Sequence, residues 1–464
     1  MKGYRLDPQD WDRFGQEMHK LLDACLDRMA GYRDLPWQPP GQMDIGLGKA
    51  SERQPEGTVF DLMAQTIMPT ATGNTHPAFW GWVHGGGIPA SIGAELVAAT
   101  MNSNCGGRDH GAAQVEAEVI RWLCATAGMA RDAFGVMTTG TSQATILALM
   151  AARVRRFGEG VRETGIRDLP PVAVYASDGA HACIAQALEV MGHGRAALRG
   201  IATNARGAMQ LEALQDAIDK DRAEGVEPLA IVGTAGSVGV GAFDDLTGVA
   251  DLAGSEGIWL HIDAAFGFWT RLADDPWHAL SDGIGRADSI ALDAHKWPGV
   301  QYDCGACLIA DRDLHRATFA SRPAYLESAA EGLAGGDTWF TDYGLELSRG
   351  FRALKLWAAI QTCGTRALGA AITDNCRQAA LMGEMVEDSP VLKLAHPVIS
   401  NVCCFAVEKG DVSRIAADLQ LAGQAVFSTI TLNGTPCLRA AIVNHRTTED
   451  DLRRAIAAVE ATQH

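Results

Sequence analysis

The sequence predicts an α/β fold built around a mostly parallel, doubly wound sheet. The chain is 47% hydrophobic and only 20% charged, which is enough apolar sequence for a large buried core. From about residue 90, helical segments alternate with short apolar runs, a pattern typical of strands that are buried on both faces. The runs that we expect to form strands of this sheet are residues 134–137, 172–176, 229–233, 258–263, 289–292 and 306–309.

The first element in chain order is a helix over residues 6–29. Apolar side chains recur there at helical spacing, and Asp10 is a suitable N-terminal cap. The Pro-rich residues 35–40 cannot form the interior of a helix or strand. We therefore expect residues 1–89 to form an N-terminal helical arm that lies over either the rest of the chain or a partner subunit.

The apolar runs place a large domain at residues 90–364, near the end of which residues 351–363 predict a long helix. Beyond it we expect a small C-terminal α+β domain over residues 365–464. Its predicted elements are strands at 401–407, 425–431 and 437–443 and a closing helix at 452–459.

The composition excludes several functional classes. The 464 residues carry a formal net charge of -17, so the basic surface of a nucleic-acid-binding protein is missing. No apolar run approaches the ~18 residues that span a bilayer, and the N-terminus has no apolar signal core. The 11 cysteines are odd in number and scattered, which favours reduced thiols, and we expect Cys304 and Cys307 to pack in the core without a metal. A cytoplasmic enzyme with a small-molecule substrate is the leading hypothesis.

Lys296 is the strongest local indication of chemistry. It follows the apolar run at 289–292 closely, where an ammonium group is costly to desolvate unless it serves a purpose. Burial of this kind can make a lysine the nucleophile that forms a Schiff base. A surface turn after a strand is the alternative interpretation.

Three further segments suit one ligand. Asp263 ends an apolar run and would lie at the carboxyl edge of the sheet, where ligands bind in α/β folds, although it could simply cap the next helix. Thr141 and Ser142 precede a helical run and could offer hydroxyls and backbone amides to a phosphate. His181 lies in a turn after another run. A phosphate site, a carboxylate for a ring nitrogen and a Schiff-base lysine are what pyridoxal 5'-phosphate requires.

The order of these segments resembles the group II pyridoxal-phosphate amino-acid decarboxylases, in particular the aromatic-L-amino-acid decarboxylase branch. The resemblance covers nearly the whole chain and is carried by residues 178–181 (Asp-Gly-Ala-His), 261–265 (His-Ile-Asp-Ala-Ala) and 293–297 (Asp-Ala-His-Lys-Trp). It implies the type I pyridoxal-phosphate enzyme fold, which is aspartate aminotransferase-like, with a mostly parallel seven-stranded sheet in the large domain. It also implies a homodimer with shared active sites, in which the arm packs on the partner subunit.

The resemblance also assigns roles to residues. Lys296 would carry the cofactor covalently, and Asp263 would keep the pyridine nitrogen protonated. His181 and Ala265 would pack on the two faces of the ring. The remaining expected cofactor contacts are Thr141, Ser142, Thr234 and His295. Val238 stands where the family commonly has a hydroxyl residue.

Two later residues bear on the reaction. Tyr325 matches the tyrosine of the family's mobile catalytic loop, which would donate a proton to the substrate carbon, and Arg349 matches an arginine for the substrate carboxylate. An exposed loop tyrosine and a structural ion pair are the alternatives. The substrate pocket would include Trp82 and His84 together with Asn104 and Arg108, the last two across the dimer.

Decarboxylation of an L-amino acid, with an aromatic one favoured, is therefore the leading prediction. An aldehyde synthase or another pyridoxal-phosphate lyase on this fold, an acidic or small substrate, and a catalytically silent relative stay open as alternatives. Trp82 could stack on an aromatic substrate, whereas Arg108 could pair with an acidic one.

Overall fold

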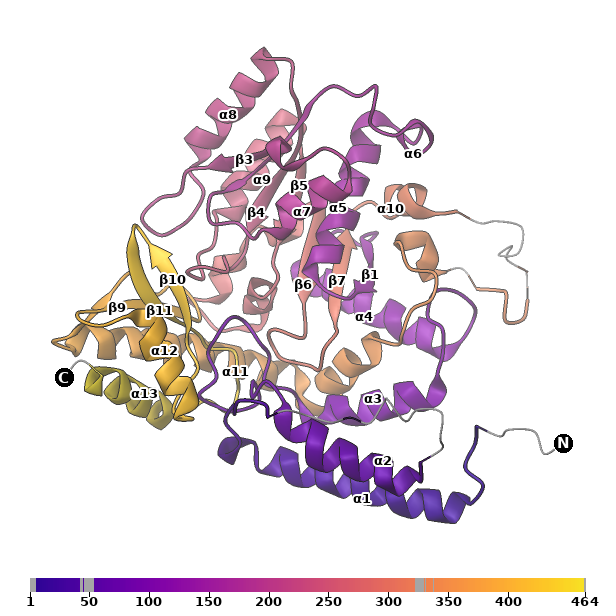
Figure 1. Ribbon diagram of the computed structural model, residues 1–464. Helices are drawn as coiled ribbons and strands as arrows, with labels where there is room; N and C mark the ends of the chain where they lie inside the picture. Colours follow the sequence, from indigo (N-terminus) through magenta and orange to yellow (C-terminus); the bar gives the residue numbers. More distant parts are fainter. Residues whose placement is uncertain are drawn as a thin grey trace.

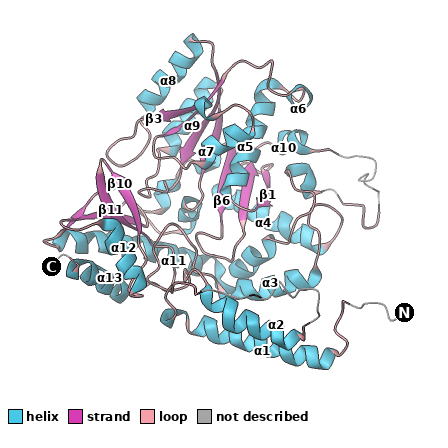
Figure 2. Cartoon of the chain, in the orientation of Figure 1, coloured by secondary structure: helices cyan, strands magenta, loops and turns pink. Residues whose placement is uncertain are grey.

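The computed structural model describes residues 6–41, 45, 54–321, 329, 331–336 and 338–462. A seven-stranded sheet lies in the large domain, a four-stranded sheet lies in the C-terminal part, and a helical arm runs along one edge (Figure 1). Figure 2 shows helices around both sheets. The predicted α/β fold with a large, mostly parallel sheet and a smaller α+β unit is confirmed.

The large sheet has the strand order β1-β7-β6-β5-β4-β2-β3. Its strands are β1 (Phe134–Thr138), β2 (Val172–Ser177), β3 (Leu198–Ile201), β4 (Glu227–Thr234), β5 (Trp259–Asp263), β6 (Ser289–Asp293) and β7 (Gly305–Ile309). Only β7 runs against its neighbours β1 and β6, and the other pairs are parallel. Because β7 returns directly beside β6, the loop between them, which contains Lys296, stays at the carboxyl edge of the parallel strands.

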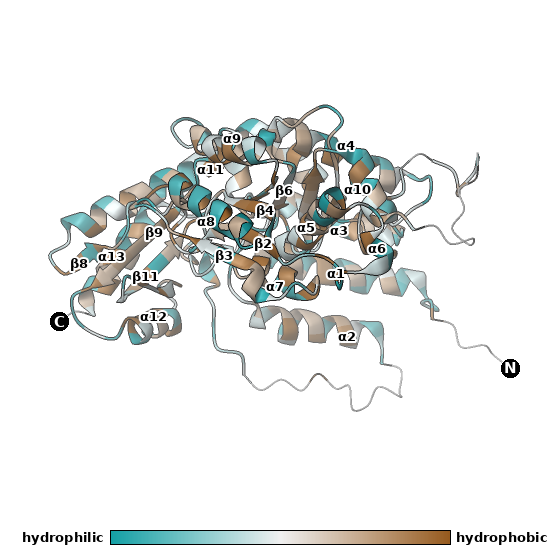
Figure 3. Ribbon diagram, turned by 90° about the horizontal axis from the view of Figure 1, so that it is seen from above, coloured by the Kyte–Doolittle hydropathy of each residue, from teal (hydrophilic) through white to brown (hydrophobic). Residues whose placement is uncertain are grey.

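The large domain contains several helices, most of which cover this sheet. They are α3 (Pro89–Met101), α4 (Gly111–Ala127), α5 (Thr141–Phe157), α6 (Val161–Thr164), α7 (Cys183–Val190), α8 (Leu211–Ala223), α9 (Leu246–Glu256) and α10 (Arg312–Phe319). Helices α5 and α7 pack on one another, as do α8 and α9. The labelled strands β2, β4 and β6 are mainly apolar and lie between these helices (Figure 3). All residues of β1, β2, β5, β6 and β7 are buried, as expected of strands covered on both faces.

The C-terminal part has a core of its own. Its sheet has the order β10-β11-β9-β8, with β8 (Leu392–Leu394), β9 (Val402–Val407), β10 (Ser428–Leu432) and β11 (Thr435–Ala441). Helices α12 (Val412–Leu421) and α13 (Glu449–Ala461) contribute to the same apolar cluster. The long helix α11 (Ala353–Asp388) joins the two parts and is interrupted at Gly364, where φ is 74° and ψ is 151°. The division into three domains stays a prediction, but its second boundary coincides with this interruption.

The N-terminal arm consists of α1 (Trp11–Ala30) and α2 (Glu56–Leu62), which pack on one another (Figure 1). The predicted cap is confirmed, because the Asp10 carboxylate accepts a hydrogen bond of 3.0 Å from the backbone amide of Arg13. Neither helix contains a buried residue. Arg33, in the short segment after α1, forms an ion pair with Asp451 of α13, and its Nη1 lies 2.9 Å from Oδ1 of Asp451.

Three properties that the sequence suggested can be compared with the structure: the state of the cysteines, membrane-spanning helices and metal-binding clusters. All eleven cysteines are unpaired, and Cys304 and Cys307 are buried, as predicted. In the described part of the chain, no helix combines the length and the apolar character needed to cross a membrane. The described residues also contain no cluster of three or more histidine, cysteine or acidic side chains suited to a metal ion.

Candidate active site

A cavity of about 380 Å³ lies at the carboxyl edge of the large sheet and collects most of the predicted site residues. The predicted residues that line it are Trp82, His84, Thr141, Ser142, His181, Thr234, Asp263, Ala265, His295 and Lys296. Trp82 and His84 lie in the segment before α3, and the others come from the ends of β2, β4, β5 and β6, from the turns after these strands and from the start of α5. Parallel strands bring their carboxyl ends to one edge, which explains why segments so far apart in sequence meet here.

Lys296 reaches the cavity from the loop after β6. Its Nζ lies 2.9 Å from Oδ2 of Asp293, the last residue of β6, and the two side chains are 25% and 2% exposed. Burial would lower the pKa of Lys296, but the carboxylates of Asp293 and Asp263 outweigh it and raise this pKa above its ordinary value. The lysine is therefore held in place as an ammonium ion, not exposed on a surface turn.

Asp263 is the last residue of β5, and its side chain is buried. Oδ1 accepts a hydrogen bond of 3.2 Å from the backbone amide of Ala265. Burial raises the pKa of Asp263, while the positive charge of Lys296 opposes the rise. A buried carboxylate of this kind is suited to a cationic partner such as a protonated ring nitrogen.

The start of α5 has the features of a phosphate site. Thr141 is the first residue of α5, so this end of the helix offers backbone amides and the positive end of the helix dipole to an anion. The hydroxyls of Thr141 and Thr234 are buried without a hydrogen-bond partner. Buried hydroxyls are normally paired, so the unpartnered hydroxyl of Thr141 at the start of α5 fits a bound phosphate.

The two predicted histidines are oriented by the backbone. Nδ1 of His181 accepts from the amide of Cys183 at 3.2 Å, and Nδ1 of His295 accepts from the amide of Cys304 at 3.1 Å. Each ring therefore carries its hydrogen on Nε2. Burial lowers the pKa of His295, so this ring is neutral near pH 7 and can donate one hydrogen bond from Nε2.

One side of the cavity is aromatic. The ring of His84 stacks on that of Trp82, with centroids 5.7 Å apart and an interplanar angle of 24°. The ring of Tyr302 meets His84 edge-on at 6.3 Å and lies 4.5 Å from His295. Val238 also lines the cavity and is 42% exposed.

Two ionisable residues that line the cavity, Asp293 and Tyr302, were not predicted from the sequence. Asp293 could have been found, because it ends an apolar run just as Asp263 does. Tyr302 could not, because only the tertiary fold of the loop between β6 and β7 turns its ring toward the cavity. Burial, followed by the charge of Asp293, raises the pKa of Tyr302 to about 12, so its hydroxyl stays protonated.

The prediction that Arg349 binds the substrate carboxylate needs correction. This arginine is buried away from the cavity, where Nη2 lies 2.7 Å from Oε1 of Glu116 on α4. It also donates to the carbonyl oxygens of Cys105 and Met137, at 3.0 Å and 2.6 Å. Since its guanidinium is already paired with a carboxylate and two carbonyls, Arg349 is a structural residue.

Two other predicted residues, Asn104 and Arg108, do not line this cavity. The amide oxygen of Asn104 accepts from the backbone of Gly106 and Arg349, and Arg108 lies over the ring of Trp339 at 4.8 Å. Their expected place in the site of a partner subunit stays a prediction. Tyr325 lies outside the described residues.

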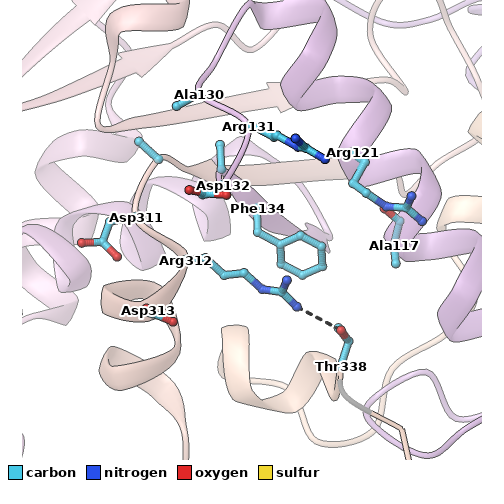
Figure 4. A pocket seen from close by; sticks show the side chains of 12 residues that line it. Ala117, Arg121, Ala130, Arg131, Asp132, Phe134, Asp311, Arg312, Asp313 and Thr338 are labelled. Atoms are coloured by element: carbon cyan, nitrogen blue, oxygen red, sulfur yellow. Dashed lines mark hydrogen bonds between the residues drawn. The ribbon is translucent and has the colours of Figure 1, made fainter.

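A larger cavity, of about 810 Å³, lies at the opposite end of β1, beside Phe134 (Figure 4). It contains no predicted site residue. Three arginines and three aspartates balance one another along its wall: Arg121, Arg131, Arg312, Asp132, Asp311 and Asp313. Arg312 already donates to the hydroxyls of Thr338 and Tyr343, each at 3.0 Å. The described residues that line this cavity therefore include no lysine, histidine or cysteine, and their charges balance.

Comparison with known proteins identifies relatives that align with nearly the whole chain. Residues 40–408 match the model of the pyridoxal-dependent decarboxylase conserved domain. The chain is 27% identical to the aromatic-L-amino-acid decarboxylase of Bacillus atrophaeus, over 96% of this chain and 95% of that protein. It is 25% identical to the phenylacetaldehyde synthase of Arabidopsis thaliana, over 98% and 96%. The crystal structure of TDC from Oryza sativa with PLP and tryptamine superposes with a TM-score of 0.88 at 23% identity, covering 99% of each chain.

Proposed function

Because the chain belongs to the pyridoxal-dependent decarboxylase family, we propose that it removes the carboxyl group of an aromatic L-amino acid as carbon dioxide and releases the amine. The family makes it a carboxy-lyase with pyridoxal 5'-phosphate as cofactor. When bound, this cofactor withdraws electrons from the substrate α-carbon as the carboxylate leaves. The observation that carries the proposal is the meeting of Lys296, Asp263, His181 and the start of α5 in one cavity.

Each of these groups has a task in the proposal. Lys296 supplies the nitrogen that binds the cofactor, and the buried Asp263 carboxylate keeps a proton on the ring nitrogen, which makes the ring a stronger electron acceptor. The start of α5, with Thr141, Ser142 and Thr234, holds the phosphate. His181 and Ala265 line the cavity where they could cover the two faces of a flat ring.

An aromatic substrate is supported by the wall made of Trp82, His84 and Tyr302. Flat aromatic surfaces bind aromatic side chains through stacking and apolar contact. Among the described residues that line the cavity there is no arginine, and the lysine is paired with Asp293, so these residues offer no free cation to an acidic side chain. An acidic substrate would depend on a partner residue such as Arg108.

The second candidate is an aldehyde synthase, which the similarity to phenylacetaldehyde synthase keeps open. The two functions differ in products, since a decarboxylase yields the amine whereas an aldehyde synthase yields aldehyde, ammonia and peroxide. We propose Tyr325 as the proton donor that directs the reaction to the amine. Its replacement in Tyr325→Phe should lower the amine yield by roughly 10²–10⁴-fold and release aldehyde in aerated buffer.

The decisive experiment measures all products for a panel of the twenty L-amino acids. We expect carbon dioxide and amine in equal amounts, fastest with an aromatic substrate. Aldehyde and peroxide as main products would favour the synthase. Release of carbon dioxide only from acidic or small amino acids would refute the aromatic assignment. An enzyme that binds the cofactor but releases nothing would be a silent relative.

We further propose a homodimer in the cytoplasm. Helices α1 and α2 of the N-terminal arm contain no buried residue although they carry many apolar side chains, which suits a surface that a second copy covers. Eleven unpaired cysteines suit a reducing compartment.

A further inference from the structure

Asp244 is buried and has no role in the function proposed so far. It lies between β4 and α9, outside the set of residues that line the cavity. Its Oδ2 accepts a hydrogen bond of 2.7 Å from the backbone amide of Thr234, and its own backbone amide donates to the carbonyl oxygen of Thr234 at 3.0 Å. Asp244 therefore holds Thr234, which does line the cavity, at both of its backbone polar groups.

The end of the sheet explains why Thr234 needs this partner. β5 pairs with β4 as far as Thr234, whereas β2 pairs with it only as far as Val232. The backbone amide of Ala235 donates to the carbonyl oxygen of Asp263 on β5, at 2.9 Å. The polar groups of Thr234 therefore point to the opposite side, where the pairing with β2 has already ended. Buried backbone groups are nearly always paired, and Asp244 supplies the pairing that β2 does not.

The carboxylate of Asp244 is suited to this task because it is ionised. Burial raises its pKa to about 6, while the hydrogen bonds from the backbone amides of Met209 and Thr234 oppose the rise. Near pH 7 both oxygens can therefore accept, and Oδ1 lies 2.6 Å from the amide nitrogen of Met209. A neutral side chain of the same size, such as asparagine, has only one oxygen for the two amides.

The hydroxyl of Thr234 is the group that this contact would serve. It is buried and has no hydrogen-bond partner in the described part of the chain. Thr234 and Asp263 are paired in register on adjacent strands, so their side chains project from the same face of the sheet. Asp263 is the proposed partner of the ring nitrogen, and an unpartnered buried hydroxyl beside it is suited to a polar atom of the cofactor.

We propose that Asp244 is a positioning residue for the cofactor. By completing the backbone pairing of Thr234 at the end of β4, it fixes the direction in which the Thr234 hydroxyl enters the cavity. Asp244 itself touches neither cofactor nor substrate. Loss of its carboxylate should free the end of β4 and turn the hydroxyl away from the cofactor, which then binds more weakly. This inference rests on the proposed cofactor site.

The test is a double-mutant cycle in cofactor affinity, measured on the full chain after removal of its cofactor. Equilibrium dialysis would give the Kd of 4'-deoxypyridoxine 5'-phosphate, an analogue without the aldehyde, so that covalent linkage does not contribute. Thr234→Val removes the hydroxyl and should raise this Kd about tenfold, the loss of one hydrogen bond. Asp244→Ala should also raise it about tenfold. The double variant should still show about a tenfold rise, because both changes remove the same contact.

Asp221→Ala is the matched control. Asp221 is also buried and accepts from Tyr175 and Arg199, at 2.9 Å and 3.0 Å, outside the cavity. Its loss should lower the unfolding temperature without changing the Kd. If Asp244→Ala does not fold, Asp244→Asn replaces it in the cycle. One oxygen cannot serve both amides, so the Kd should rise about threefold, and this rise should vanish in the Thr234→Val background.

The outcomes separate this inference from the proposed function. An unchanged Kd in a folded Asp244 variant, or effects that multiply in the double variant, would overturn the inference alone. An unchanged Kd in Thr234→Val would overturn it too, because the hydroxyl through which Asp244 acts would not contact the cofactor. If the unmodified chain binds neither the analogue nor pyridoxal 5'-phosphate, the proposed function itself is wrong.

Discussion

Lys296 is the residue on which the assignment of the site depends most directly. The proposal predicts that Lys296→Ala abolishes the covalent, borohydride-reducible link to pyridoxal 5'-phosphate, because no other nitrogen nucleophile is held at that position. Mass spectrometry after reduction would measure the link. Lys355→Met is a matched control, since Lys355 is also buried but pairs with Glu95 at 2.6 Å, outside the cavity. A reducible link in Lys296→Ala would show that a different lysine is used.

The proposed role of Asp263, to keep a proton on the ring nitrogen of the cofactor, can be tested by substitution. In Asp263→Asn the carboxylate no longer holds a proton on the ring nitrogen, and we expect a loss of roughly 3 kcal/mol or more of transition-state stabilisation, about a hundredfold in kcat. Cofactor content, measured by absorbance, should stay near full occupancy. Asp221→Asn is the control, because Asp221 is buried beside Arg199 and Tyr175, outside the cavity, and should leave kcat unchanged. A loss under tenfold in Asp263→Asn with full occupancy would refute the role.

At the residue scale, the sequence identified side chains at strand ends better than it identified charge partners. Lys296 and Asp263 follow apolar runs, so their places at the carboxyl edge could be predicted from local pattern. Arg349 could not be placed in this way, because its partner Glu116 is remote in sequence and only the fold brings α4 beside it. The motif match therefore singled out Arg349 but could not predict that its side chain lies away from the cavity and pairs with Glu116.

At the scale of elements, strands were predictable where burial on both faces makes the sequence uniformly apolar. The two unpredicted strands lack this pattern. In β3, Arg199 lies at the edge of the sheet and pairs with Asp221 at 3.0 Å, so its charge is compensated by a contact outside the strand. β8 has only three residues and depends on its pairing with β9. Such strands are specified by tertiary contacts and carry little signal of their own.

Strand β11 makes a contact that bears on the cavity. Arg439 is buried and donates from Nε to the carbonyl oxygen of Gly239 and from Nη1 to that of Trp82, each at 2.9 Å. It thereby joins the C-terminal sheet to two segments that line the site, one of which carries Trp82 itself and the other the neighbouring Val238. We infer that Arg439 positions the cavity wall without touching substrate.

This inference predicts a selective effect on substrate binding. In Arg439→Lys a single ammonium cannot reproduce the planar fork that reaches both carbonyls, so we expect KM to rise about tenfold while kcat and cofactor content change little. Steady-state kinetics with the best substrate of the panel would measure both constants. Arg414→Lys, at an exposed position on α12, is the control. An unchanged KM in a folded Arg439→Lys variant would contradict the role.

At the scale of the whole molecule, the N-terminal helices expose a large amount of apolar side-chain surface. Exposed apolar side chains lie on α1, α2, α3 and the short π-helix Met63–Ile67 after α2: Trp11, Leu22, Leu26, Val59, Met63, Ile67, Leu96, Val97 and Met101. A monomer in water rarely exposes this much apolar side chain in neighbouring elements. The sequence predicted the arm and its helix. It could not predict which surface the arm packs against, because helical periodicity shows that a helix has an apolar face but not what that face contacts.

The proposed homodimer can be tested at this surface. Leu26 on α1 is 49% exposed, and Leu26→Asp would place a charge that a dimer interface must desolvate. We expect the unmodified chain to have twice its own mass by light scattering and Leu26→Asp to dissociate at concentrations where the unmodified chain does not. Leu421→Asp makes the same change at a 55% exposed position on α12 and should leave the dimer intact. Since the proposal places Asn104 and Arg108 in the site of the partner, dissociation should also raise KM. A monomeric unmodified chain, or a Leu26→Asp dimer as stable as the original, would refute the assembly through the arm.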